Sequence, residues 1–541
     1  MTAIRKTWLI LLVLLSSVLL PLALPSEFFG GAIKALGMRP DESFYWGNAV
    51  IGLICIAPVF YAVSLAPTFG FASLLGVIFG GVSTALSSFW LMFFQNFSVW
   101  TYGGVILGYI GYNSLLFPFL RGISRISTRF RPFLLAITWC VYEYFKSVGF
   151  LAYPWGLVAY PMGNFLPLIQ FVDITGVWGL SFLMALVNAI VAELALAGWR
   201  PLFIRQAGFL LVLLACALGY GAYRLSTPIP HESSASLLLV QQNLNPWDAG
   251  GGRDESLRIN SELTLQAVRA SPRKPDLAVW SESSVSTVYV TLDKKYYQQK
   301  NDLVPAIQKA GIPVLFGGVV VIDLQKEQAW NASILASPDG AVQDIYGKIH
   351  GVPFAENIPF WDLEGVRWFF RNVVGVWNPW VTGDRLTIFH VPLAAGGQMA
   401  FSTPICFEDA FSDLCRQYIT HGADILLNIT NDSWSDTWSA EIQHFQAARF
   451  RAIEDRRVLV RSANGGVSGV VGPWGEIQIK MPFFERTWKL VDVPLYKEKT
   501  PTFYTRFGDW FPRLLIVLLF VVLVGNRLWK KKRLPLADSL L

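Results

Sequence analysis

FSTPICFED, residues 401–409, is the most informative stretch of this 541-residue chain, because it places Cys406 where an apolar run typical of a buried strand gives way to a helical pattern. Two other apolar runs also lead to ionisable residues: DLAVWSES (276–283) reaches Glu282, and IYGKIHGVPFAEN (345–357) contains Lys348. A cysteine attacks a carbonyl carbon as a thiolate, so a base must take its proton, and Glu282 can do so. The oxyanion that follows needs a cation or N–H donors, and Lys348 supplies a cation. The sequence therefore predicts a thiol acyl-transfer site whose base is a carboxylate.

The segments around these three residues alternate between strand and helix patterns from Ser236 onward. We expect strands at 236–240, 277–280, 313–322, 331–337, 398–402, 424–430, 457–463, 468–473 and 476–481, and helices at 255–271 and 439–457. Asp339-Gly340 predicts a hairpin turn before the strand that carries Lys348. This pattern predicts an α/β sandwich domain.

PICFED (404–409) and YGKIHGVPFAEN (346–357) resemble segments of the nitrilase (carbon–nitrogen hydrolase) superfamily. The resemblance implies two β-sheets packed face to face with helices outside, in αββα order. It also implies that Glu356 and Glu408 are active-site glutamates that orient Lys348 and the thiol and help to move a proton.

Aromatic residues near these motifs are candidate substrate contacts. VQQNLNPWD (240–248) resembles the first strand and loop of the superfamily, with Trp247 at the position of its substrate-contacting tryptophan. Residues 431–466 resemble the stretch that closes the site and include Trp434. Either tryptophan contacts substrate or only packs in the core. Phe407 stands where the family usually has tyrosine, so an aromatic ring remains there but the hydroxyl that could form a hydrogen bond is absent.

The rest of the chain is predicted to lie in a membrane, because 53% of all residues are hydrophobic and only 15% are charged. Apolar runs occur at 8–24, 46–65, 69–94, 100–120, 132–148, 176–197, 207–225 and 514–526. Most are long enough to span a bilayer, so we expect about eight membrane helices. The first run is alternatively a cleaved signal peptide, but its removal would reverse the charge pattern of the rest. The expected domains are a membrane domain at 1–228, a catalytic domain at 229–505 and a last helix with a basic tail at 506–541.

Positive charges predict the orientation of these helices. Arginine and lysine gather at alternate helix ends: Arg5 and Lys6; Arg121, Arg125, Arg129 and Arg131; Arg200 and Arg205; and Lys530, Lys531, Lys532 and Arg533. Both termini are therefore expected in the cytoplasm, and the α/β domain on the outer, periplasmic side of a bacterial inner membrane. These flanks explain the net charge of +6, and no basic, aromatic-interleaved stripe indicates nucleic acid.

Cysteine and histidine patterns give no indication of a metal, cofactor or disulfide. The five histidines lack paired-ligand spacing, and neither Cys-x-x-Cys nor a phosphate-binding glycine loop occurs. FEDAFSDLCRQYI (407–419) is expected to form one helix, in which Cys406 and Cys415 would be too far apart to bridge. Both are predicted to be free thiols.

The aromatic stretch 359–380 is either core or an arm at the lipid interface, where tryptophan is enriched, and we expect the arm. In the membrane part, EYFKSVGFLAYPWG (143–156) and TPTFYTRFGDWFP (500–512) resemble segments of the apolipoprotein N-acyltransferase family, although Lys146 stands where arginine is usual.

The family resemblance implies a two-step reaction. Cys406 takes an acyl chain from a phospholipid, typically phosphatidylethanolamine, and passes it to the α-amino group of the lipid-modified N-terminal cysteine of an apolipoprotein. Glu282 acts as base in both steps, and Lys348 with the N–H of Phe407 holds the oxyanion. Two alternatives remain: a membrane-tethered amidase that passes the acyl group to water, and a transporter or scaffold that carries an inactive nitrilase domain.

Overall fold

The computed structural model describes residues 3–35, 37, 45–95, 98–247, 252–297, 302–377, 379–496 and 500–537. The chain forms two compact units. Unit 1 comprises residues 1–89, 102–223 and 507–541, and unit 2 comprises residues 90–101 and 224–506. The segment 90–101 follows one apolar helix in the sequence and includes the first residues of the next. It groups with the α/β unit, although the expected domain limits assigned it to the membrane domain.

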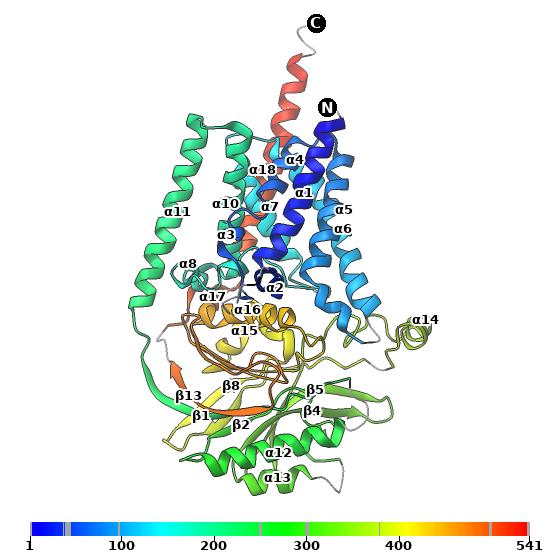
Figure 1. Ribbon diagram of the computed structural model, residues 1–541, viewed down its shortest axis with the longest axis vertical. Helices are drawn as coiled ribbons and strands as arrows, with labels where there is room; N and C mark the ends of the chain where they lie inside the picture. Colours follow the sequence, from blue (N-terminus) through cyan, green and yellow to red (C-terminus); the bar gives the residue numbers. More distant parts are fainter. Residues whose placement is uncertain are drawn as a thin grey trace. The chain divides into compact units, whose positions relative to one another are not determined.

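Unit 1 is helical (Figure 1). Among the described residues, six helices are long and apolar enough to cross a membrane: α1 (Ala3–Ala23), α5 (Phe69–Ser87), α6 (Ser98–Ser124), α10 (Val177–Ala197), α11 (Pro201–Ser226) and α18 (Trp510–Ala537). Shorter helices accompany them: α2 (Glu27–Ala35), α3 (Ala49–Gly52), α4 (Ala57–Leu65), α7 (Arg131–Phe145), α8 (Leu166–Ile169) and α9 (Val172–Thr175). The chain is a polytopic membrane protein, and its helix count agrees approximately with the eight expected.

The helix expected over 46–65 is broken, and the structure gives the reason. A turn separates α3 from α4, and the N–H groups of Ile56 and Ala57 donate to the side-chain oxygen of Asn188 at 2.9 and 3.0 Å. The amide nitrogen of Asn188 donates to the carbonyl oxygen of Gly52 at 2.9 Å. An asparagine on α10 thus satisfies the backbone groups that the break exposes, as buried polar groups require. The helix expected over 132–148 ends at Phe145, whereas α18 is longer than the run at 514–526 indicated.

Unit 2 contains two β-sheets. The first has the order β13-β1-β2-β4-β5-β6, with β3 paired to β4, and the second has the order β12-β11-β10-β9-β8-β7. The strands are β1 (His231–Gln241), β2 (Leu277–Val279), β3 (Tyr289–Thr291), β4 (Val314–Asp323), β5 (Gln328–Ala336), β6 (Val342–Gly347), β7 (Phe389–Pro392), β8 (Gln398–Ser402), β9 (Ile425–Thr430), β10 (Val458–Ala463), β11 (Gly469–Val471), β12 (Ile477–Lys480) and β13 (Thr487–Tyr496).

Helices cover the outer faces of both sheets (Figure 1). Helices α12 (Gly252–Ala270) and α13 (Leu303–Ala310) lie over the first sheet, while α15 (Ser412–Thr420) and α16 (Trp438–Asp455) lie over the second. The predicted αββα architecture is therefore confirmed. The expected hairpin joins β5 to β6, with Gly340 at φ +86° in the turn.

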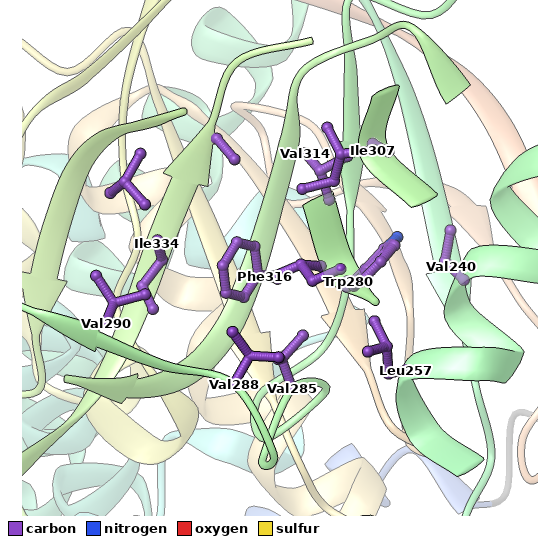
Figure 2. Packing of buried hydrophobic residues seen from close by; sticks show 14 of the residues in the cluster. Val240, Leu257, Trp280, Val285, Val288, Val290, Ile307, Val314, Phe316 and Ile334 are labelled. Carbon is purple, nitrogen blue, oxygen red and sulfur yellow. The ribbon is translucent and has the colours of Figure 1, made fainter. Parts of the chain in front are cut away.

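The outer layer of unit 2 is held by a hydrophobic core between the first sheet and its helices (Figure 2). Trp280 and Phe316 are buried at its centre, and the indole N–H of Trp280 donates to the hydroxyl of Thr264 on α12 at 2.9 Å. Burying each large apolar side chain stabilises the fold by about 1.5–3 kcal/mol. Because Trp280 lies two residues before Glu282, this core fixes the strand end from which that carboxylate projects.

Candidate active site

Cys406 lies in a tight turn after β8 and has a positive φ of +54°. A one-turn helix, Cys406–Ala410, begins there, and the side-chain amide of Asn428 on β9 donates to the carbonyl oxygens of Pro404 and Cys406 at 2.9 and 2.8 Å. A positive φ at a non-glycine residue costs about 1–3 kcal/mol and persists only where surrounding contacts hold it. The predicted strand-to-helix junction is present in a strained form.

The single helix expected over 407–419 is wrong. The one-turn helix ends at Ala410, Phe411 has an extended backbone, and α15 starts at Ser412. All five cysteines, Cys406 and Cys415 included, are free thiols.

Lys348 directly follows the last residue of β6, and Glu282 lies three residues after the last residue of β2, both in the first sheet. The backbone at Glu282 lies directly against β4: a Cβ atom added to Gly317 would lie 2.6 Å from the Cα atom of Glu282. Only glycine permits this close approach. Lys348 is aligned by its own N–H, which donates to the carbonyl oxygen of Asn331 on β5 at 2.9 Å.

The two side chains meet in one buried cluster with Glu356. The Nζ atom of Lys348 lies 3.5 Å from Oε1 of Glu282 and 2.8 Å from Oε2 of Glu356. The side-chain amide of Asn331 donates to both carboxylates, at 2.7 Å to Glu282 and 3.1 Å to Glu356. The N–H of Asn431 donates to Oε2 of Glu282 at 2.9 Å. One lysine therefore sits between two carboxylates whose orientations are fixed by hydrogen bonds.

Burial controls the protonation of this cluster. Burial raises the pKa of the Cys406 thiol well above its ordinary value; the charge of Glu282 adds to this effect and that of Lys348 opposes it. Burial also raises the pKa of Glu282, against the opposing charge of Lys348. Burial alone would lower the pKa of Lys348, but the carboxylates of Glu356 and Glu282 outweigh it and raise that pKa well above its ordinary value. Lys348 thus stays cationic, and Glu282 is a stronger base than an exposed glutamate.

Glu408 ties the cysteine turn to the segment after Lys348. Its carboxylate accepts hydrogen bonds from the N–H groups of Ile349 and His350 at 2.8 Å, from that of Ile405 at 2.7 Å and from the hydroxyl of Tyr346 at 2.9 Å. Burial raises the pKa of Glu408 to about 7, although these N–H donors favour its ionised form. Glu408 therefore contacts the backbone on both sides of the site, while Glu356 contacts the lysine itself.

The three aromatic candidates form two groups. Phe407 packs edge to face with Phe411 at 5.1 Å between ring centroids, and the Nζ atom of Lys348 lies 5.5 Å from the centroid of the Phe407 ring. Trp247 and Trp434 pack edge to face at 5.0 Å, and the indole N–H of Trp247 donates to the carbonyl oxygen of Trp434 at 2.8 Å. Phe94, from the segment 90–101, stacks on Trp434 at 6.4 Å. Substrate contact by Trp247, Trp434 and Phe407 stays a prediction.

The aromatic stretch 359–380 has some side chains packed in a core and others exposed as in an arm. It forms α14 (Glu364–Phe369) and a π-helical turn (Phe370–Val374), which lie at the edge of unit 2 (Figure 1). Trp361 and Phe370 pack against a small buried cluster that includes Val374. Trp368 and Trp377 are 60% and 71% exposed, as an arm would require. Its placement at a lipid interface stays a prediction.

Several residues of the site escaped the sequence analysis. Asn331 and Asn428 orient the carboxylates and the cysteine turn, and an asparagine within an otherwise apolar strand was the available signal. A second buried charged cluster, Asp409, Asp432, His444 and Arg461, had no sequence signal, because its members come from four separate segments. Among the described residues, no group of three or more His, Cys, Asp or Glu side chains is arranged to hold a metal ion.

An αββα domain with a buried glutamate and lysine and a partly exposed cysteine, joined in sequence to a unit of membrane helices, defines a membrane-bound member of the nitrilase class. Residues 239–498 match the carbon-nitrogen hydrolase family model, and residues 30–190 match that of the apolipoprotein N-acyltransferase N-terminal domain.

Relatives whose sequences align with nearly the whole chain identify the family within this class. "Apolipoprotein N-acyltransferase 2" of Treponema denticola is 37% identical over 94% of this chain and 97% of its own length. The protein of the same name from Treponema pallidum is 37% identical over 89% and 91%, and "Apolipoprotein N-acyltransferase" of Borreliella burgdorferi is 31% identical over 94% and 97%. The chain belongs to the apolipoprotein N-acyltransferase family.

Proposed function

We propose that this protein transfers a fatty acyl chain from a membrane phospholipid to the α-amino group of the N-terminal diacylglyceryl-cysteine of apolipoproteins, through a thioester on Cys406. The observation that carries the proposal is the buried cluster of Glu282, Lys348 and Glu356 beside the strained Cys406 turn, in a chain of this family. Helices long and apolar enough to cross a membrane support substrates whose acyl groups reside in lipid.

In the first half-reaction the sulfur of Cys406 attacks the carbonyl carbon of a phospholipid ester, and Glu282 takes the thiol proton. The carbon–oxygen ester bond then breaks. The leaving lysophospholipid alkoxide takes the proton from Glu282 and departs as an alcohol. The product is a thioester between Cys406 and the acyl chain.

In the second half-reaction the α-amino group of the acceptor attacks the thioester carbonyl, and Glu282 takes a proton from that nitrogen. The sulfur–carbon bond breaks, the proton returns to Cys406, and an amide remains on the lipoprotein. Both half-reactions pass through a tetrahedral oxyanion. Lys348 and the N–H of Phe407 stabilise it electrostatically.

The remaining candidate residues have supporting roles in this proposal. Glu356 orients Lys348, which it contacts at 2.8 Å, and Glu408 fixes the turn that presents the thiol. Trp247, Trp434 and Phe407 contact the acyl chain or the headgroup of a substrate. The mechanism uses no cofactor or metal.

The protein is proposed to lie in the bacterial inner membrane with its catalytic domain, about residues 229–505, on the periplasmic side and both termini in the cytoplasm. The distribution of Arg and Lys between the apolar runs supports this orientation. Reporter fusions at about residue 300 should be active only outside the cytoplasm, and fusions after Lys532 only inside it. The reverse result would exclude this topology.

The function is tested by incubating the purified full chain with phosphatidylethanolamine vesicles and a synthetic diacylated lipopeptide. The expected product is a lipopeptide heavier by one fatty acyl group, with an equimolar lysophospholipid, both detected by mass. Phosphatidylglycerol vesicles with the same acyl chains test the headgroup preference. Release of free fatty acid without acylated lipopeptide would instead favour a hydrolase, the membrane-tethered amidase alternative.

A further inference from the structure

A buried charged feature outside the proposed catalytic cluster is a closed ring of four side chains, which we name the ion ring: Asp409, His444, Asp432 and Arg461. The two nitrogens of the His444 ring lie 2.9 Å from a carboxylate oxygen of Asp409 and 2.8 Å from one of Asp432. Arg461 contacts the second oxygen of Asp409 and lies 3.1 Å from the second oxygen of Asp432. None of the four side chains is more than 7% exposed.

This geometry fixes the charge of each member. An ionised carboxylate only accepts hydrogen bonds, so each His444 nitrogen that faces one must carry a proton. His444 is therefore an imidazolium, and the ring alternates two cations with two anions and has no net charge. The pKa directions agree with the contacts. Burial alone would lower the pKa of His444, but Asp432 and Asp409 raise it to about 9. Burial alone would raise the pKa of Asp432, but His444 and Arg461 lower it to about 2.

Other ionisable groups near the ring do not upset this balance. Glu441, one turn before His444 on α16, is fully buried, and neither carboxyl oxygen has a hydrogen-bond partner among the described residues. Burial and the charge of Asp432 raise the pKa of Glu441 well above its ordinary value, so it is neutral. Asp436 is exposed to solvent. The hydroxyl of Thr430 donates to Asp432 at 2.8 Å and completes its set of donors.

The ion ring joins the two segments that carry the chemistry. Asp409 lies in the one-turn helix that starts at Cys406. Asp432 directly follows Asn431, whose N–H holds Oε2 of Glu282. His444 and Arg461 bridge these segments from α16 and β10. The charge of Asp432 also acts on the thiol, because it raises the pKa of Cys406.

We propose that His444 and Arg461 are positioning residues that hold the turn carrying Cys406 against the backbone that binds Glu282. Their positive charges also offset the effect of the Asp432 charge on the Cys406 thiol. This inference rests on the proposed function only where it predicts a change in the rate of thioester formation. The electrostatic part is measurable on the thiol without any lipid substrate.

The test uses the full-length protein in detergent micelles and measures iodoacetamide alkylation of Cys406 against pH, followed by mass on the peptide that contains it. His444→Gln leaves the ring with a net negative charge, so the alkylation midpoint should move to higher pH. Asp432→Asn leaves a net positive charge, so the midpoint should move to lower pH. The double variant His444→Gln/Asp432→Asn is neutral, and its midpoint should return toward that of the unaltered protein.

Thioester formation from phospholipid gives the positioning readout. His444→Gln should slow it by about 10²-fold, the size of effect expected when a reacting group is displaced by about 1 Å. The double variant should recover about tenfold of this loss, because removing the second partner relieves an unbalanced charge. His421→Gln, an exposed histidine on the same domain, serves as the matched substitution and should change neither readout.

If His444 and Arg461 had only a structural role, the expected result would differ. Ile307→Ala opens a cavity in the outer core, remote from the ring, and shows how far a loss of melting temperature alone changes the rate. If both single variants leave the alkylation midpoint unmoved, and rates follow melting temperature as in Ile307→Ala, the inference is overturned. If His444→Gln does not fold, Asp432→Asn and the neutral double variant still decide it. An unaltered protein that fails to acylate would count against the proposed function and not against the shifts in midpoint.

Discussion

Two buried charged clusters in the same α/β unit have opposite designs. In the ion ring two cations, His444 and Arg461, cancel two anions, Asp409 and Asp432. In the catalytic cluster one ammonium, Lys348, is shared by two carboxylates, of which Glu356 is 16% exposed and Glu282 only 6%. Buried charges are costly unless they are paired. The comparison teaches that the balanced cluster suits a fixed support, whereas the unbalanced cluster can take up a proton from a neighbouring thiol.

We expect the largest effect from removing Glu282, the proposed base of the catalytic cluster. Glu282→Gln keeps the shape of the side chain but removes the proton acceptor, so thioester formation should slow by about 10²–10⁴-fold. Raising the pH should restore part of the rate, because solvent then ionises Cys406. Single-turnover acylation against pH measures both. Glu262→Gln on α12, an exposed glutamate paired to Arg258, is the matched control and should keep the full rate.

Lys348→Met tests the cation of the same cluster. Without its charge the oxyanion loses a stabilising partner, so acylation and transfer to the amine should both slow by about 10²–10³-fold. High pH should not restore either half-reaction, in contrast to Glu282→Gln. Lys309→Met, at an exposed lysine on α13, controls for the substitution. Equal rescue of the Glu282 and Lys348 variants by high pH would mean that Lys348 acts mainly on the thiol pKa, and the division of roles would be wrong.

Glu408→Gln probes the link between the cysteine turn and the lysine segment. A glutamine offers N–H where the carboxylate now accepts from backbone N–H groups, so at least one buried donor loses its partner. The expected cost is about 1–3 kcal/mol of unfolding free energy. Thermal denaturation of the detergent-solubilised protein checks it, and an unchanged melting temperature would show that this carboxylate is not a structural link.

The ion ring predicts a pH dependence of stability. The pKa of His444 is raised from 6.5 to about 9 in the folded protein. Its stabilising contribution is therefore complete below pH 6.5 and is lost as the pH rises through 9, and the difference corresponds to about 3 kcal/mol. The melting temperature should fall more steeply between pH 7 and 9 in the unaltered protein than in His444→Gln. Parallel curves would mean that His444 does not hold its charge in the folded state.

Local pattern was enough to predict much of this molecule. Apolar alternation located strands such as β8, β9 and β10 within one residue of their observed starts. The side chains of Glu282, Lys348 and Glu356 lie together, and their catalytic roles stay predictions. β13 was missed because Lys489 and Asp492 interrupt its apolar pattern, and it forms by pairing with β1 along its length.

What stayed hidden depends on contacts between distant segments. Sheet register places Asn331 beside Lys348, and four separate elements build the ion ring. The positive φ of Cys406 depends on contacts such as those of Asn428. Neither the register of the strands nor the backbone strain at Cys406 can be predicted from the local sequence. The same holds for residues 90–101, whose Phe94 stacks on Trp434 within unit 2.

The central claim is that Cys406 carries the acyl group, and one measurement tests it directly. The full chain is incubated with phospholipid vesicles without acceptor, and its peptides are analysed by mass. We expect one fatty acyl group on the peptide that contains Cys406, removable by hydroxylamine, retained in Cys415→Ser and absent from Cys406→Ala. An acyl group on Cys415 or on a serine, or acylation that persists in Cys406→Ala, would contradict it.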